Sequence, residues 1–145
     1  MEELLACILL YGEDLLPWEV YQEKLDALFL EDPDNDLLQE LEWNSVDRKG
    51  AYAKLREYWA DRAGEIRMEV FGRFFMARLK EVFWREDLDI RWFGRRMYSL
   101  WESLPPWLQD IQPFWTLCYA DDPLSWGDEA QSRELYREML EYYEK

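Results

Sequence analysis

The stretch EDPDNDLLQELEW, residues 31–43, carries the side chains best placed for chemistry, with aspartates at positions 32, 34 and 36. Carboxylates at this spacing begin the calcium loop of an EF-hand, which also needs glycine at its sixth position and a bidentate glutamate at its twelfth. Counted from Asp32, those positions hold Leu37 and Trp43. Leucine does not readily adopt the positive φ of the turn and tryptophan cannot bind calcium, so we expect no metal site here.

The same stretch has the features of a helix N-terminus. Asp32 can act as the N-cap, Pro33 suits the first turn, and the next two aspartates would lie near the positive end of the helix dipole. An apolar face follows at helical spacing, formed by Leu37, Leu38 and Leu41. We therefore predict a helix that begins at Asp32.

Other catalytic chemistry is poorly represented in the chain. Its 145 residues include no histidine, which removes the commonest general base, the Ser-His and Cys-His nucleophiles and the usual zinc sites. The two cysteines, Cys7 and Cys118, lie among apolar neighbours and are expected to be free thiols. No glycine pattern typical of phosphate binding occurs. We expect no catalytic residue, no cofactor and no metal, although a carboxylate pair acting alone stays open among 32 acids.

The elements that position these side chains are predicted to be helices, because apolar residues recur at intervals of three and four nearly throughout. The heavily apolar segment 65–84 is expected to be a central helix, and no run alternates as a strand would. Four prolines between 105 and 123 predict short turns and a loop. The expected helices are 4–12, one from Pro17, one from Asp32, one from Ser45 with Gly64 as its break, 65–84, 88–103 and 128–143.

These elements predict an all-α protein, an irregular single-domain bundle of about five to seven helices with no significant sheet. A length of 145 residues is typical of one domain. Aromatic residues make up 17% of the chain, more than one small core needs. Two interpretations stay open: a dense core with tryptophan tips at its rim, or aromatics at the surface, where they commonly contact a partner.

The net charge of −15 is distributed unevenly along the chain. Residues 1–46 hold 13 acids and one base, 47–100 hold 9 acids and 13 bases, and 101–145 hold 10 acids and 3 bases. Nucleic acid and anionic membrane require a positive surface, so neither is expected as a direct partner. Arg73, Arg78, Lys80 and Arg85 in the middle third are expected to pair with acids of the outer thirds.

The N-terminus lacks the basic region of a signal peptide, so we expect a cytoplasmic protein.

The acidic surface is the remaining candidate site, because a concentration of like charge costs stability through self-repulsion. Trp18 and Trp43 flank the acidic stretch of the N-terminal third, and Trp126 lies within a second acidic stretch, residues 119–129. An exposed tryptophan can anchor a partner. The candidate partner-binding residues are Trp18, Glu19, Glu23, Asp26, Glu31, Asp32, Asp34, Asp36, Glu40, Glu42, Trp43, Asp121, Asp122, Trp126, Asp128 and Glu129.

In its size, its charge and its lack of catalytic groups, the chain is similar to bacterial immunity proteins and to protein mimics of DNA. The resemblance implies a small cytoplasmic protein that binds and neutralises a basic toxin or nuclease, acting as a monomer or weak homodimer. Three alternatives stay open: an acidic surface that serves solubility alone, a scaffolding domain that self-associates through exposed aromatics, and a histidine-free carboxylate enzyme.

Overall fold

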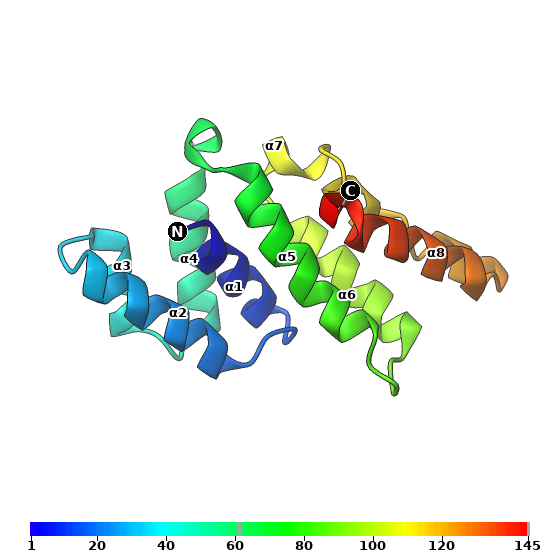
Figure 1. Ribbon diagram of the computed structural model, residues 1–145, viewed down its shortest axis with the longest axis horizontal. Coiled ribbons are helices and arrows are strands. Elements are labelled where there is room, and N and C mark those ends of the chain that lie inside the picture. The colour runs from blue at the N-terminus through cyan, green and yellow to red at the C-terminus, as the bar shows by residue number, and fades with distance from the viewer. Residues whose placement is uncertain (61, 145) are drawn as a thin grey trace. The chain divides into compact units, whose positions relative to one another are not determined.

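The computed structural model describes residues 1–60 and 62–144, and this part of the chain is helical without any strand (Figure 1). The predicted all-α class is confirmed, whereas the predicted count of five to seven helices is too low. Eight α-helices and four 3-10 helices occur in the described residues. They are α1 (Glu2–Gly12), α2 (Trp18–Glu31), α3 (Asp36–Trp43), α4 (Arg48–Trp59), η1 (Ala63–Glu65), α5 (Met68–Phe83), α6 (Ile90–Ser103), α7 (Pro106–Gln109), η2 (Phe114–Cys118), η3 (Asp122–Trp126), α8 (Glu129–Leu140) and η4 (Tyr142–Glu144).

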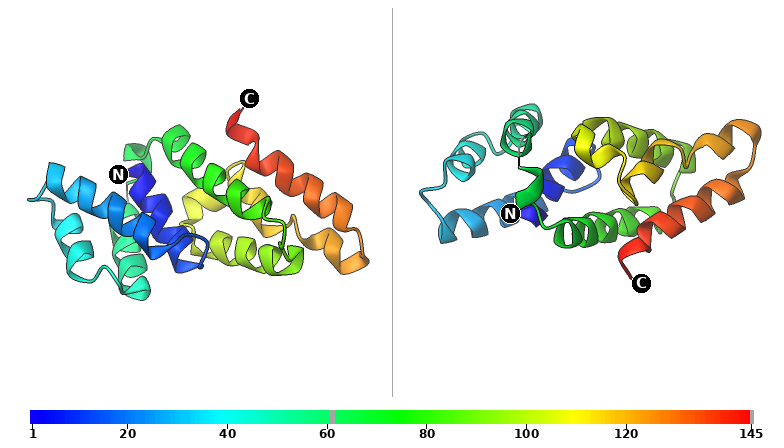
Figure 2. Two further views of the ribbon diagram at one scale, coloured as in Figure 1. Left: turned by 60° about the horizontal axis from the view of Figure 1, so that its bottom comes forward. Right: turned by 90° about the horizontal axis from the view of Figure 1, so that it is seen from above.

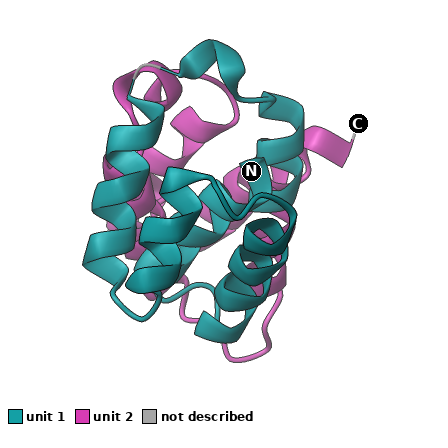
Figure 3. Ribbon diagram, turned by 90° about the vertical axis from the view of Figure 1, so that its left-hand side faces the viewer, with its two compact units in different colours: residues 1–75 teal, residues 76–145 magenta. Residues whose placement is uncertain are grey.

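The chain divides into two compact units, residues 1–75 and 76–145, with the boundary inside α5 (Figure 3). The predicted single domain stays a prediction, since one domain can contain two such units. No helix in the described part of the chain is both long and apolar enough to cross a bilayer.

Unit 1 is built around α1, whose side chains from Leu4 to Leu10 are each at most 2% exposed. A helix that is apolar on every side must be covered on every side. The helices α2 and α4 both pack against α1, and α3 packs against α2 and α4 (Figure 1 and Figure 2). The sequence analysis predicted 65–84 as the central helix, so the central place of α1 in unit 1 was not predicted.

Several helix starts differ from the prediction by a few residues. Asp32 does not cap α3; it is the C-cap of α2. The N-cap of α3 is Asn35, three residues later, whose side chain accepts a hydrogen bond from the Leu38 N–H at 3.2 Å. Likewise Asp47 rather than Ser45 caps α4, accepting from the Gly50 N–H at 3.1 Å. Both segments offer several residues able to cap, and turn geometry selects among them.

Unit 2 has an aromatic core in which Phe83, Phe93 and Tyr136 meet, with ring centroids 5.0 to 6.2 Å apart. The short helices η2 and η3 pack against α8, and η2 also packs against α6. The proline-rich segment forms α7, η2 and η3, which confirms the expected short turns. The predicted last helix, 128–143, ends earlier, at Leu140, and is followed by η4.

Candidate functional site

The carboxylates of α1 and of the α1–α2 connection are largely neutralised by bases of unit 1. Arg67 holds Glu2, whose side chain is 8% exposed, through its Nε at 2.9 Å and Nη2 at 3.1 Å, while its backbone N–H donates at 3.2 Å. These hydrogen bonds lower the pKa of Glu2 to about 2. Lys24 pairs with Glu3 at 2.5 Å.

Two bases of α4 also form ion pairs with carboxylates of unit 1. Arg48 pairs with Asp14 at 2.7 Å and lies over the ring of Tyr11. Lys54 reaches Glu40 of α3 at 3.4 Å. Glu40 was a predicted partner-binding residue, and this ion pair already engages it within the unit.

The other acids of α2, of α3 and of the turn between them have no cationic partner among residues 1–60 and 62–144. All but one are exposed; Glu42 is half-buried. Since α2 and α3 pack against each other, these unpaired carboxylates belong to one helix pair and the turn that joins it. We call these residues the unpaired acids: Glu19, Glu23, Asp26, Glu31, Asp32, Asp34, Asp36 and Glu42.

Two of the unpaired acids converge on one amide. Gln22 Nε2 donates to Asp26 Oδ1 at 2.6 Å and to Glu42 Oε2 at 3.3 Å. The Asp26 and Glu42 carboxyls are also close enough to hydrogen-bond each other. Burial and the neighbouring Asp26 raise the pKa of Glu42 to about 7. We call these three side chains the carboxyl pair cluster.

Polar atoms without partners lie beside this cluster. Gln22 Oε1 is buried and accepts no hydrogen bond from the described residues. Tyr21 is 0% exposed, its hydroxyl has no hydrogen-bond partner there, and its ring stacks on Tyr11 at 5.3 Å. Burial chiefly raises the pKa of Tyr21, and the charge of Glu42 adds to this effect. Buried polar groups are nearly always satisfied in native proteins, so both orphan atoms are exceptional.

The two tryptophans that flank the acidic stretch differ in exposure. Trp18 is half-buried and its indole N–H donates to the Ser45 carbonyl at 3.1 Å, so it helps to fix the chain after α3. Trp43, the last residue of α3, is 88% exposed. Only Trp43 of this pair is therefore free to act as an anchor, and it directly follows Glu42 in the chain.

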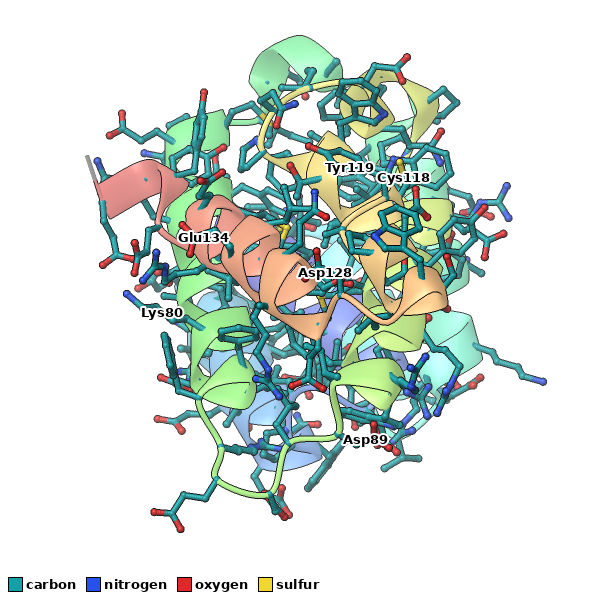
Figure 4. The ribbon with its side chains drawn as sticks, turned by 90° about the vertical axis from the view of Figure 1, so that its right-hand side faces the viewer. Lys80, Asp89, Cys118, Tyr119, Asp128 and Glu134 are labelled. Atoms are coloured by element: carbon teal, nitrogen blue, oxygen red, sulfur yellow. The ribbon has the colours of Figure 1, made fainter. Side chains whose placement is uncertain are left out.

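The second predicted acidic segment belongs to unit 2, and some of its carboxylates have structural roles. Asp128, labelled in Figure 4, caps α8 by accepting from the Gln131 N–H at 3.0 Å, and Glu129 pairs with Arg133 at 3.0 Å. Trp126 is 64% exposed. Asp122 is exposed and begins η3.

Asp121 is half-buried beside a close contact between elements of unit 2. A Cβ added to Gly94 would lie 2.8 Å from Asp121 Cβ and 3.4 Å from Tyr136 Oη. Tyr136 and Ser132 are both 0% exposed, and neither hydroxyl has a hydrogen-bond partner in the part of the chain that is described. Burial raises the pKa of Asp121. The Asp121 side chain therefore belongs to the interior of unit 2 more than to a docking surface.

The basic middle of the chain pairs differently from the prediction. Lys80, labelled in Figure 4, does reach the last third, contacting Glu144 at 2.8 Å and Glu141 at 3.9 Å. Arg73 and Arg78 instead pair within α5, with Glu69 at 2.8 Å and Glu81 at 3.4 Å. Carboxylates three or four residues away on the same helix are the nearest available partners.

The thiols differ in burial. Cys7 is buried on α1, and Cys118 is half-buried at the end of η2. Burial raises the pKa of Cys118, which makes its thiol less reactive.

Sequence reasoning missed the carboxyl pair cluster. Gln22 and Asp26 are four residues apart on α2, a spacing that brings side chains together, but Glu42 lies 20 residues beyond Gln22. Only the packing of α3 against α2 brings it near.

Comparisons with protein-family models, curated proteins and solved structures gave no match to this chain.

Proposed function

We propose that this protein is a small binding module that captures and neutralises a basic protein, of the toxin or nucleic-acid-acting enzyme class. The observation that carries the proposal is the selective pairing of charge in unit 1. Its bases engage Glu2, Glu3, Asp14 and Glu40, whereas the eight unpaired acids of α2, α3 and the turn between them are left without a cation in the described residues. A basic partner would relieve their mutual repulsion.

Complementary charge acts mainly on the rate of encounter. Steering can raise association from about 10⁵–10⁶ toward 10⁸–10⁹ M⁻¹s⁻¹ at low salt. A protein that must capture a harmful enzyme quickly benefits from such a surface. Binding of this kind weakens with ionic strength, because exposed charges are screened over about 8–10 Å at physiological salt.

Trp43 supports the same proposal. An indole that is 88% exposed is unfavourable in water and gains most when a partner covers it. Tryptophan is enriched among the few interface residues that contribute most of the binding energy. We therefore assign Trp43 as the apolar anchor beside the unpaired acids.

The test is affinity capture from cells of the native host with a tagged protein, washed at low and at high salt. We expect one basic protein in stoichiometric amount, retained at low salt and released at high salt. Replacing Glu19 and Glu23 by lysine should weaken binding of that partner roughly tenfold or more. The control reverses two exposed acids of unit 2, Glu86 and Asp87. No captured partner, or equal losses in both variants, would refute the proposal.

A second candidate function is self-association through aromatic side chains of unit 2. Trp84, Trp115 and Trp126 are 59%, 48% and 64% exposed. Contact between copies through these rings would persist at high salt, since apolar burial does not depend on charge. Analytical ultracentrifugation at 0.5 M salt separates the two candidates: a dimer that forms with concentration supports scaffolding, and a monomer at all concentrations rejects it.

A further inference from the structure

We propose that the carboxyl pair cluster of Asp26, Gln22 and Glu42 is the receptor for an arginine side chain of the basic partner. This inference rests on the proposed function and makes it specific, because it names one site and one chemical group on the ligand. It separates these three residues from the other unpaired acids, which act by their charge alone.

The geometry of the cluster suits a guanidinium group. Two carboxylates lie on one amide, with Gln22 Nε2 2.6 Å from Asp26 Oδ1 and 3.3 Å from Glu42 Oε2. An arginine has five N–H donors in a planar fork and can bond to two carboxylates together. Charge-assisted hydrogen bonds are about twice as strong as neutral ones. A guanidinium would therefore outcompete the neutral amide for these oxygens.

The orphan polar atoms are an independent observation that points to a ligand. The Tyr21 hydroxyl is fully buried, has no hydrogen-bond partner among the described residues, and lies near enough to Glu42 to respond to its charge. Within the cluster, Gln22 Oε1 is also buried and accepts no hydrogen bond from residues 1–60 and 62–144. If an arginine takes over the two carboxylates, the Gln22 amide N–H is released and becomes available to donate to the Tyr21 hydroxyl oxygen.

The titratable groups around the cluster leave its charge uncompensated in the free protein. From α1, Tyr11 and Cys7 lie near Tyr21, and neither side chain is a base. On α3, Glu40 already binds Lys54 of α4. No base of the described residues pairs with Asp26 or Glu42, so the pair retains a proton near neutral pH. An arginine must displace this proton, and binding should weaken as the pH falls.

Arginine is favoured over lysine and over a divalent cation for separate reasons. Guanidinium is less strongly hydrated than ammonium and matches a two-carboxylate geometry. Calcium requires six to eight oxygen ligands, and no group of three or more metal-binding side chains occurs in residues 1–60 and 62–144.

The experiment is a titration of the isolated protein with Nα-acetyl-arginine amide, followed by NMR of the Gln22 side-chain amide and the Glu42 carboxyl carbon. We expect saturable shifts of both signals, half-saturation at least tenfold weaker at pH 5.5 than at pH 8, and a lower apparent pKa of Glu42 with the probe. The Glu42→Gln and Asp26→Asn variants should lose the response. The Glu86→Gln variant, altered in unit 2, should keep it.

Three results would overturn the site. One is the absence of any shift at Gln22 or Glu42, and another is an equal response to Nα-acetyl-lysine amide or to calcium chloride. The third is a response that sodium chloride of matched ionic strength reproduces. The probe needs no partner, so the two proposals fail separately. Partner capture through Glu19 and Glu23 without an arginine response rejects the site alone, whereas an arginine response without a captured partner rejects the proposed function.

Discussion

Replacing Glu42 by glutamine should stabilise the protein at alkaline pH and leave its stability almost unchanged in acid. Burial and Asp26 raise the pKa of Glu42 from its usual 4.5 to about 7. The folded protein therefore binds this proton more tightly than the unfolded chain does. The stabilisation from the protonated side chain is complete below pH 4.5 and is lost as the pH rises toward 7.

The magnitude follows from that pKa difference. Each tenfold change in proton affinity corresponds to about 1.4 kcal/mol, so the full difference would cost about 3 kcal/mol above pH 7. Glu42 is only half-buried, and solvent screens part of the repulsion. We therefore expect glutamine, which carries no charge, to raise the free energy of unfolding by on the order of 1–2 kcal/mol at pH 8.

The assay is urea unfolding followed by tryptophan fluorescence at pH 5, 6, 7 and 8, with Glu19→Gln as the matched control. Glu19 is an exposed member of the same unpaired acids, and its substitution should not produce the same increase. The difference between Glu42→Gln and the parent protein should grow with pH. A difference that is constant across this range, or a variant less stable at pH 8, would refute the reasoning.

Three further substitutions test other contacts. Glu2→Gln should destabilise the protein at pH 7 by about 2 kcal/mol, because the pKa of Glu2 is lowered to about 2 by Arg67. The loss should vanish as the pH falls from 4.5 toward 2, which urea unfolding at pH 7 and pH 3 would detect. Gly94→Ala should cost about 1–3 kcal/mol, since its Cβ would lie 2.8 Å from Asp121 Cβ; an unchanged melting temperature would contradict this. Tyr136→Phe removes a buried hydroxyl that has no partner in the described part of the chain, so thermal unfolding should show no loss of stability, or a gain of up to about 1 kcal/mol. A loss above 1 kcal/mol would indicate that the hydroxyl is satisfied in solution.

The local pattern of the sequence was enough to predict the helices, because each helix buries an apolar face whose period is set by 3.6 residues per turn. The segment 65–84 was predicted and α5 spans Met68–Phe83. Helix ends were less predictable. Near α3, Asp32 and Asn35 are both good N-caps, and only the turn at the end of α2 decides that Asn35 caps the helix.

The acidic composition, the absence of histidine and the exposed charge of α2 are properties of the sequence itself, since they follow from residue identity and helical spacing. Which acids are neutralised was decided by the tertiary structure, because Arg67 and Glu2 are 65 residues apart and meet only after packing. The same holds for Glu42, which approaches Asp26 and Gln22 only when α3 packs on α2. Its pKa depends on burial and on a neighbouring charge, and both are set by the fold.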